Sequence, residues 1–345
     1  MKPKVVITQM IHREVIELLE QRCEVVPNNT PESLDGNEIL RRAKDADGIM
    51  VFMSDRIDDD FLRLCPNLKI VAAALKGYDN FDIDSCAKRG IWFTTVPDLL
   101  TIPTAELTIG LLIGLTRNIF EGDRQIRSGQ FSGWRPRLYG AGLAGKKLGI
   151  VGMGALGQAL AKRLSCFDML LYYFDPVPLV KQKESSWGLS LVSFHHILTQ
   201  SDYLVLAVPL KPDTFHLIDQ NVLAIIKPGM FLLNTCRGSV VDEDAVAASL
   251  ANGRLAGYAA DVFEMEDWAR QDRPTSIPKA LIKMTSATLF TPHLGSALDE
   301  ARREIELQAA HNILEAFQGK RPSGAINNIA NNKIRPSEEE SFPLG

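Results

Sequence analysis

Short apolar runs alternate with amphipathic segments from the start of the chain. The apolar runs of the first 97 residues predict strands at Val5–Thr8, Glu24–Val26, Gly48–Phe52, Lys69–Leu75 and Trp92–Val96. The segments between them have helical periodicity, as in His12–Gln21, Asn37–Lys44 and Asp59–Leu64. Strands that alternate with helices form a parallel sheet covered on both faces. This part of the chain therefore predicts a small α/β unit.

A second series of the same kind begins at Lys147. Its predicted strands are Lys147–Val151, Leu170–Phe174, Tyr203–Val208, Phe231–Asn234, Gly257–Asp261 and Leu289–Thr291. A long helix from Pro103 to about Arg127 comes before it, followed by the loop Gly133–Gly140. The last amphipathic helix, roughly Leu298–Phe317, lies beyond the second series. This helix could return to the first unit and make that domain discontinuous.

Composition limits the class of protein. The chain has 345 residues, more than the ~250–300 at which single cores stop growing, so two domains are expected. Its 46% hydrophobic and 23% charged residues are ordinary for a globular protein, and its net charge of −4 gives no excess of positive charge for nucleic acid. The longest apolar stretch, Leu107–Leu115, is too short to span a bilayer. Five cysteines without a CxxC pair favour a reduced, cytoplasmic compartment.

The segment Gly152–Gly157 has the pattern G-x-G-x-x-G between a predicted strand and a predicted helix. In that context Gly152, Gly154 and Gly157 permit close approach of a pyrophosphate, and the N-terminus of the predicted helix Gln158–Leu164 supplies free N–H groups. Ala155 and Leu156 of the same turn are further expected cofactor residues. A glycine-rich turn without a ligand is the alternative.

A carboxylate at the end of the next strand extends this pattern. Asp175 lies 18 residues after Gly157 and should bind the adenosine ribose 2′-OH. Pro176 offers no cation for a 2′-phosphate, so NAD is expected over NADP. Alternatively, Asp175 could merely cap a turn.

Three further segments follow predicted strands: Asn234–Gly238, Asp261–Glu266 and Thr291–Ser296. They carry an Arg, a Glu and a His, which suit anion binding and acid–base chemistry at a His oriented by a carboxylate. The other histidines, at positions 12, 195, 196, 216 and 311, are interpreted as ordinary polar residues. No spacing of His, Cys or carboxylates is typical of a metal site, so none is predicted.

With these motifs the chain resembles the NAD-dependent D-isomer-specific 2-hydroxyacid dehydrogenases over about residues 4–327. The resemblance implies that Arg237 binds and polarises the substrate, His293 moves a proton and Glu266 supports His293. It also implies two doubly wound parallel-sheet α/β domains, with a Rossmann NAD domain inserted into a discontinuous, flavodoxin-like substrate domain. The expected bounds are 1–99 with 296–327 for the substrate domain, 100–295 for the NAD domain and 328–345 for a flexible tail.

The same resemblance implies further NAD contacts and an oligomer. The additional cofactor residues are Thr104, Val208, Pro209, Cys236, Asp261 and Gly295. A small buried core residue is the alternative for Cys236. Homodimerisation through the 103–127 helix is also implied.

Longer strings resemble the phosphite dehydrogenases within that family. They are Ala74–Asp82, Val96–Thr101, Pro103–Glu106 and Gly257–Arg270. The expected reaction is NAD-dependent oxidation of phosphite to phosphate, in which hydride leaves the P–H bond and water adds to phosphorus with His293 as base. This reaction would belong to phosphorus metabolism. The implied substrate residues are Met53, Lys76, Gly77, Trp134, Tyr139, Arg237, His293 and Arg302.

Alternatives remain for several of these residues and for the reaction. Lys76 could be a solvated surface lysine, Arg302 a surface ion-pair residue, and Trp134 and Tyr139 an interdomain or subunit contact. The alternative enzyme is a D-2-hydroxyacid dehydrogenase or glyoxylate-type reductase that uses the same Arg, Glu and His. A dinucleotide-sensing corepressor of this fold is the alternative outside enzymes.

Overall fold

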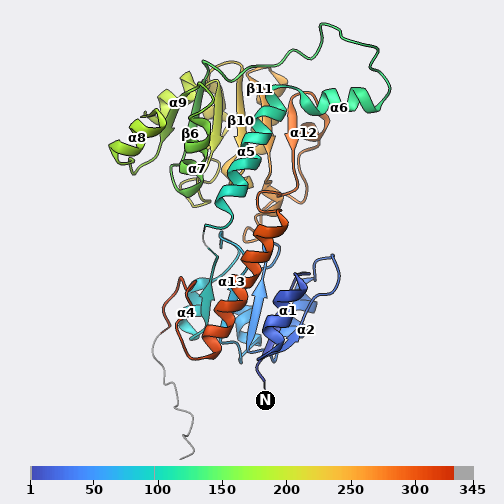
Figure 1. Ribbon diagram of the computed structural model, residues 1–345, viewed down its shortest axis with the longest axis vertical. Helices are drawn as coiled ribbons and strands as arrows, with labels where there is room; N and C mark the ends of the chain where they lie inside the picture. Colours follow the sequence, from blue (N-terminus) through green and yellow to red (C-terminus); the bar gives the residue numbers. More distant parts are fainter. Residues whose placement is uncertain (1, 97, 330–345) are drawn as a thin grey trace, which may run out of the picture. The chain divides into compact units, whose positions relative to one another are not determined.

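The computed structural model describes residues 2–96 and 98–329, which form two compact units (Figure 1). The first unit comprises Met1–Pro97 together with the chain from Arg302 onward, and the second comprises Asp98–Ala301. Most of the expected flexible tail, residues 330–345, lies outside the described residues.

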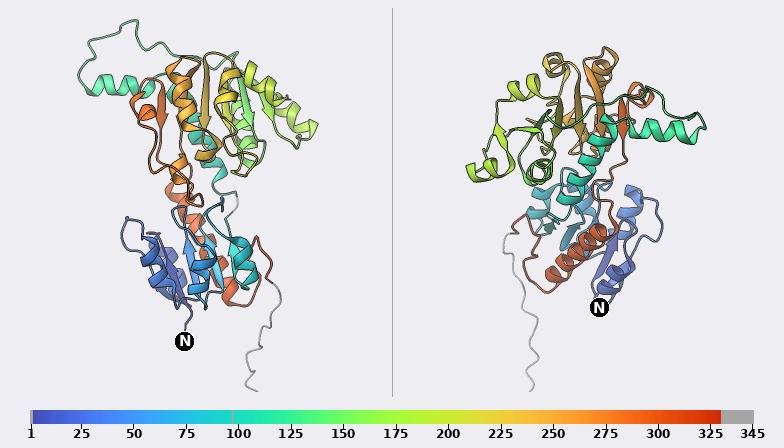
Figure 2. Two further views of the ribbon diagram at one scale, coloured as in Figure 1. Left: turned by 180° about the vertical axis from the view of Figure 1, so that it is seen from behind. Right: turned by 45° about the horizontal axis from the view of Figure 1, so that its top comes forward.

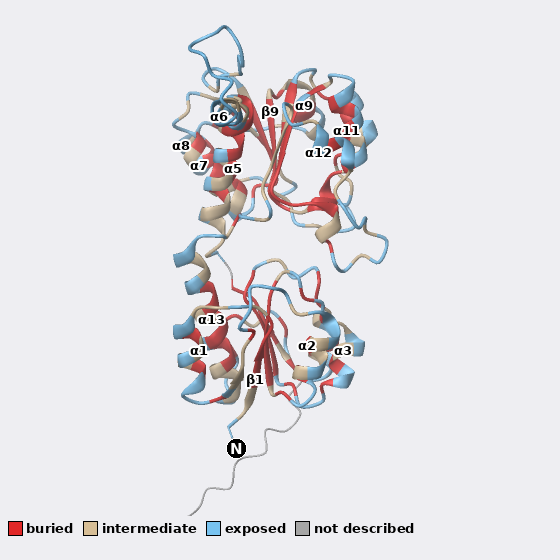
Figure 3. Cartoon of the chain, turned by 90° about the vertical axis from the view of Figure 1, so that its right-hand side faces the viewer, coloured by how far each residue is buried: buried red, intermediate tan, exposed pale blue. Residues whose placement is uncertain are grey.

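The first unit is built on a five-stranded parallel sheet of order β2-β1-β3-β4-β5, the flavodoxin-like order. Its strands are β1 (Lys4–Ile7), β2 (Glu24–Val26), β3 (Gly48–Val51), β4 (Ile70–Ala73) and β5 (Trp92–Thr94). Its helices are α1 (Arg13–Glu20), α2 (Gly36–Ala43), α3 (Asp59–Leu64), α4 (Ile83–Lys88) and most of α13 (Asp299–Phe317). Figure 3 shows α1 and α13 on one face of the sheet and α2 and α3 on the other. Strands β3 and β4 are therefore buried throughout and are almost wholly apolar.

The chain after α13 completes this first unit. Ala325 forms an antiparallel bridge with Thr94 of β5. The Phe93 N–H donates to Oδ1 of Asn327 (2.9 Å), and the Ile326 N–H donates to the Phe93 carbonyl (3.1 Å). Residues far apart in the sequence thus share one edge of the sheet.

The second unit is built on a seven-stranded parallel sheet of order β12-β11-β10-β9-β6-β7-β8. Its strands are β6 (Lys147–Val151), β7 (Leu170–Phe174), β8 (Leu189–Leu191), β9 (Tyr203–Leu206), β10 (Met230–Asn234), β11 (Leu255–Ala260) and β12 (Thr288–Phe290). Its helices are α5 (Thr101–Thr116), α6 (Ile119–Arg127), α7 (Ala155–Leu164), α8 (Lys181–Trp187), α9 (Phe194–Gln200), α10 (Gln220–Ile225), α11 (Glu243–Ala251) and α12 (Lys279–Lys283), with 3₁₀ turns η1 (Gly238–Val240) and η2 (Glu264–Glu266). In Figure 3, α5 and α7 cover one face and α9, α11 and α12 the other. The expectation of two doubly wound parallel-sheet domains is confirmed.

Two sequence predictions were wrong in detail. The helix expected from Pro103 to about Arg127 is two helices, because Asn118 adopts the left-handed conformation (φ 53°) between α5 and α6. In Figure 2, α6 and the loop that follows it extend away from the sheet of this unit. Strand β8 was not predicted, because only Leu189 of its three residues is buried and the apolar signal is weak.

Among the helices of the described residues, none combines the length and apolar character needed to cross a bilayer.

Candidate active site

The predicted Arg, Glu and His follow three neighbouring strands of the second unit. Arg237 follows β10, Glu266 ends η2 after β11, and His293 follows β12. The Nδ1 atom of His293 lies 2.6 Å from Oε2 of Glu266. The other carboxylate oxygen, Oε1, accepts the Phe263 N–H at 2.8 Å. The structure thus brings Glu266 and His293 together and fixes the orientation of the carboxylate.

Asp261, the first residue after β11, holds the turn that carries His293. Its carboxylate accepts the Leu294 N–H (2.7 Å), the Gly295 N–H (2.8 Å) and the Thr291 hydroxyl (2.5 Å). Burial raises the pKa of Asp261, and these hydrogen bonds oppose that shift. The turn constrains His293 itself, which has a φ of 56°. A positive φ outside glycine is uncommon and is often found at functional sites.

Two other predicted cofactor residues lie beside this turn. The Thr104 hydroxyl donates to the Gly295 carbonyl at 3.2 Å. A Cβ on Gly295 would lie 3.0 Å from that hydroxyl oxygen and 3.2 Å from Oδ2 of Asp261. The predicted residues Thr104, Asp261 and Gly295 are therefore neighbours.

The turn of Arg237 is built by Asn234 at the end of β10. The Asn234 side chain donates to the Arg237 carbonyl (2.9 Å) and accepts the Cys236 N–H (3.2 Å). The Arg237 guanidinium donates to the Cys236 carbonyl (2.8 Å). Cys236 is buried, and burial raises the pKa of its thiol to about 11, so the thiol stays neutral. Cys236 is thus a buried residue beside the predicted substrate-binding arginine.

The glycine-rich turn fits a dinucleotide. A Cβ on Gly152 (φ 95°) would lie 2.5 Å from the Ala207 carbonyl oxygen, and one on Gly157 would lie 2.2 Å from that of Gly152. A Cβ on Gly154, at the N-cap of α7, would meet nothing within 4 Å. Two glycines therefore permit tight packing of the turn, and the third leaves open space at the helix N-terminus, where a pyrophosphate would bind.

Asp175 lies at the end of β7 and contacts the same turn. Its Oδ2 accepts the Met153 N–H (2.7 Å) and its Oδ1 accepts the Val177 N–H (2.8 Å). Each carboxylate oxygen has a second lone pair for a ribose hydroxyl. Val208 and Pro209 follow β9, and the Val208 side chain would be 2.8 Å from a Cβ on Gly152. The structure thus places Asp175 and Val208 around the glycine-rich turn.

The first unit carries four of the predicted substrate residues, namely Met53, Lys76, Gly77 and Arg302. The first three lie at the carboxyl ends of β3 and β4. Met53 follows β3, its carbonyl accepts the Asn80 side chain at 3.0 Å, and Lys76 and Gly77 follow β4. Arg302, in α13, donates to the Ala74 carbonyl at 3.4 Å. Its guanidinium also lies over the Phe52 ring, 5.6 Å from the centroid.

Trp134 and Tyr139 lie on the loop after α6, in the second unit. Each is 77% exposed. The pocket beside Trp134 is lined by α6 and by its own loop, and Arg237, Glu266 and His293 do not line it.

Two histidines interpreted as ordinary polar residues contact buried carboxylates. The Nε2 atom of His216 lies 2.9 Å from Oε2 of Glu264, which is 48 residues away in the sequence. The Nδ1 atom of His12 lies 2.7 Å from Oε2 of Glu306, 294 residues away. No local spacing signals such pairs, and only the fold brings them together.

Comparison with known proteins defines the class. Residues 109–295 match the family model described as D-isomer specific 2-hydroxyacid dehydrogenase, NAD binding domain. The chain belongs to this family. It is an oxidoreductase, and its cofactor is NAD.

Individual relatives are similar to this protein over nearly the whole chain. The chain is 37% identical to a glyoxylate reductase from Thermococcus litoralis, over 95% of this chain and 97% of that protein. It is 36% identical to a glyoxylate reductase from Thermofilum pendens, over 98% of each chain. Among solved structures, the TT0316 protein from Thermus thermophilus matches with a TM-score of 0.84 and 31% identity, over 94% of this chain and 99% of that chain.

These relatives contradict the predicted oxidation of phosphite. Proteins that match nearly the whole chain are named for reduction of glyoxylate, a 2-oxo acid. The prediction rested on four strings, Ala74–Asp82, Val96–Thr101, Pro103–Glu106 and Gly257–Arg270, which make up a small part of the chain. The relatives favour the alternative given above, a D-2-hydroxyacid dehydrogenase or glyoxylate-type reductase. A P–H bond is therefore no longer expected as the hydride donor.

Proposed function

We propose that this protein interconverts small 2-oxo acids and 2-hydroxyacids with NAD, and that glyoxylate is a preferred 2-oxo acid. The observation that carries the proposal is the 2.6 Å contact between His293 and Glu266, which follow β12 and β11, beside the strand β10 that presents Arg237. A 2-oxo acid offers a carboxylate and a carbonyl, so it needs an anion-binding group and a proton donor. This set supplies both.

Each of the three residues has a separate task in this proposal. The planar guanidinium of Arg237 binds the substrate carboxylate and polarises the carbonyl. His293 donates a proton to the carbonyl oxygen during reduction and removes it during oxidation. Glu266 orients the imidazole through Nδ1, so Nε2 is the atom that exchanges the proton. NADH supplies the hydride when bound to the Gly152–Gly157 turn.

We further propose that the first unit supplies substrate contacts from the carboxyl end of its sheet. The proposed residues are Met53, Lys76, Gly77 and Arg302. Lys76 is exposed, and Arg302 is partly buried between the Ala74 carbonyl and the Phe52 ring. Both carry the positive charge that a carboxylate requires.

A homodimer is proposed on the exposed apolar side chains of α6 and its loop. Seven large apolar residues there are exposed: Ile119, Phe120, Ile126, Phe131, Trp134, Leu138 and Tyr139. Ile126, Phe131, Trp134 and Leu138 line one pocket, and clustered exposed apolar side chains of this kind mark interaction sites. Light scattering of the purified protein, compared with a Phe131→Ser/Trp134→Ser variant, tests this assignment. A monomeric wild-type protein would contradict it.

The function is tested by the substrates that the purified protein turns over. NADH oxidation should be fastest with glyoxylate or another small 2-oxo acid, and NAD reduction should be seen with D-2-hydroxyacids. His293→Ala should lose about 10²–10⁴-fold in kcat while NADH binding persists, because the nucleotide turn is separate. His195→Ala, on the exposed side of α9, is the matched control. Failure to turn over any 2-oxo acid or 2-hydroxyacid, with phosphite assayed in parallel, would overturn the proposal.

A further inference from the structure

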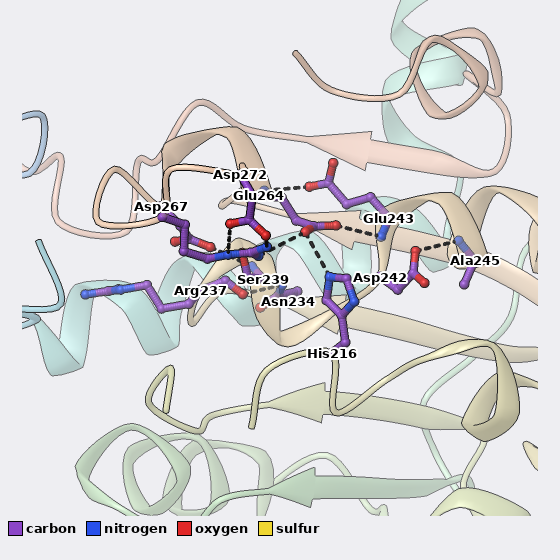
Figure 4. Close-up of polar contacts among 11 residues, drawn as sticks. His216, Asn234, Arg237, Ser239, Asp242, Glu243, Ala245, Glu264, Asp267 and Asp272 are labelled. Atoms are coloured by element: carbon purple, nitrogen blue, oxygen red, sulfur yellow. Dashed lines mark hydrogen bonds and ion pairs between the residues drawn. The ribbon is translucent and has the colours of Figure 1, made fainter. Parts of the chain in front are cut away.

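The guanidinium of Arg270 contacts side chains from the loops that follow three neighbouring strands, β9, β10 and β11 (Figure 4 shows the surrounding polar contacts). Its Cζ atom lies 4.1 Å from the ring centroid of Phe215, in the loop after β9. Its Nη1 donates to the Ser239 hydroxyl (2.9 Å), after β10, and lies 3.6 Å from Oε2 of Glu264, after β11. Its Nη2 pairs with Asp272 at 3.0 Å. One planar cation therefore joins three loops.

The turns after β10 and β11 also touch directly. The Ser239 N–H donates to Oδ2 of Asp267 at 2.8 Å. A Cβ on Gly238 would lie 1.9 Å from the Phe263 carbonyl carbon, so the two backbones are in close contact. The His216 N–H donates to the Ser239 carbonyl at 2.8 Å. Ser239 is thus held through its N–H, its carbonyl and its hydroxyl.

The guanidinium of Arg270 lies beside a group of buried carboxylates. Glu264, Asp267 and Glu243 are all buried, and Glu264 and Glu243 each accept the other's N–H, at 3.2 and 2.9 Å. His216 approaches Glu264 from the opposite loop at 2.9 Å. Buried carboxylates are costly unless they are paired and hydrogen-bonded. Arg270 supplies a permanent positive charge to this group.

Arg270 is connected to Arg237 and Glu266 through the turns on which those two residues lie. In Figure 4 the Arg237 side chain points away from the buried carboxylates, while its backbone carbonyl accepts a hydrogen bond from the Asn234 side chain. Ser239 lies two residues after Arg237, and Glu264 lies two residues before Glu266. Whatever fixes Ser239 and Glu264 relative to each other therefore fixes the two turns that present Arg237 and Glu266.

We propose that Arg270 is a positioning residue that sets the placement of Arg237 relative to Glu266, and through it the affinity for the 2-oxo acid. The proposal rests on the function proposed above. A misplacement of about 1 Å can reduce the rate about 10²-fold. None of the residues that Arg270 contacts, Phe215, Ser239, Glu264 and Asp272, is a predicted cofactor residue, so NADH affinity is expected to change much less than substrate affinity.

Kinetics of four variants test the route from Arg270 to Ser239. Arg270→Met should raise KM for glyoxylate about 10–100-fold, with a smaller fall in kcat and less than a twofold change in KM for NADH. Arg270→Lys keeps the charge but lacks the planar guanidinium that contacts all three loops. Its increase in log KM for glyoxylate should therefore be more than half of the increase in Arg270→Met. Ser239→Ala should show part of the Arg270→Met effect, and the double variant should be no worse than Arg270→Met alone. Complete recovery by Lys, or fully additive losses, would overturn the proposal.

A matched arginine provides the control. Arg273 lies on the same loop and also stacks on an aromatic ring, with Cζ 4.1 Å from the Trp268 centroid. Trp268 belongs to that same loop, so Arg273→Met should change KM for glyoxylate less than twofold. An equal effect of both substitutions would show that the loop alone matters and that Arg270 has no special role.

Hydrogen exchange separates this proposal from the proposed function. In Arg270→Met the amides of Ser239 and His216 should exchange at least ten times faster, while those of Met153 and Gly157 should be unchanged. This readout needs no substrate. If the wild-type protein reduces no 2-oxo acid, the proposed function fails and the exchange data still decide whether Arg270 holds the two turns. Unchanged exchange at Ser239 would overturn the role of Arg270 even in an active enzyme.

Discussion

The Nδ1 atom of His293 lies 2.6 Å from Oε2 of Glu266, and Oε1 of the same carboxylate accepts the Phe263 N–H. Both oxygens of Glu266 are therefore engaged, one by the backbone of its own turn and one by the imidazole. The hydrogen bond to Oε1 fixes the orientation of the carboxylate, so Oε2 faces Nδ1 of His293. The histidine tautomer with a proton on Nδ1 is the one that this arrangement favours.

We expect Glu266→Gln to lower kcat for glyoxylate reduction by about 10²–10⁴-fold. The Gln side-chain oxygen can still accept the Phe263 N–H. Its amide nitrogen would then donate to Nδ1 and favour the tautomer with the proton on Nε2, which is the wrong tautomer for catalysis, as in other His–carboxylate pairs. Initial rates with saturating NADH measure this effect, and NADH binding by fluorescence should change less than twofold. A variant with wild-type kcat would show that Glu266 does not orient His293.

Much of the fold could be predicted from the sequence because buried parallel strands are continuous apolar runs. The predicted runs at Lys69–Leu75 and Lys147–Val151 contain or match β4 and β6. The failures have local causes. Strand β8 has one buried residue, and the break at Asn118 depends on one residue in a left-handed conformation within an otherwise helical pattern. Neither leaves a periodic signal.

The site could be predicted in part, for a related reason. Arg237, Glu266 and His293 each follow a strand, so the parallel sheet predicts that they share one edge. The network behind them has no such signal, because Arg270, Phe215 and Ser239 come from three loops whose contacts depend on tertiary packing. The substrate was predicted wrongly, because the strings used to infer it identify the family's scaffold without fixing which small anion the site accepts.

Gly238→Ala should abolish most activity by separating the turns of Arg237 and Glu266. The added Cβ would lie 1.9 Å from the Phe263 carbonyl carbon and 2.2 Å from the Glu264 nitrogen, so one backbone must move. We expect kcat/KM for glyoxylate to fall at least 10²-fold. Gly142→Ala is the matched control, since its Cβ would meet nothing within 4 Å. Equal activity of the two variants would contradict the close packing.

NADH should be preferred over NADPH because of the charge on Asp175. Asp175→Ala would remove both that charge and the acceptor of the Met153 N–H, whereas Asp175→Asn keeps an acceptor and removes only the charge. Asp175→Asn combined with Pro176→Arg, which adds a partner for a 2′-phosphate, should lower the ratio of kcat/KM for NADH over NADPH at least tenfold. Asp175→Asn alone should give an intermediate ratio. An unchanged ratio in the double variant would rule out Asp175 as the basis of the preference.

Glu243 should make the stability of the protein depend on pH near neutrality. Burial raises the pKa of this carboxyl from 4.5 to about 7, and the negative charges of Glu264, Asp267 and Glu266 add to the shift, while the Glu264 N–H opposes it. Among the described residues, its Oε2 atom has no hydrogen-bond partner. Deprotonation in the folded protein is therefore unfavourable.

The direction of the effect follows from proton binding. Between pH 4.5 and about 7 the folded protein keeps a proton on Glu243 that the unfolded chain releases, so the free energy of unfolding falls as pH rises through that window. Glu243→Gln is neutral at every pH and can still accept the Glu264 N–H. The free energy of unfolding of Glu243→Gln relative to wild type should therefore increase by about 1–3 kcal/mol between pH 5 and pH 8. Urea titrations across this range measure the difference, with exposed Glu304→Gln as the control. A difference that stays constant with pH would show that Glu243 is already charged in the folded protein at pH 5.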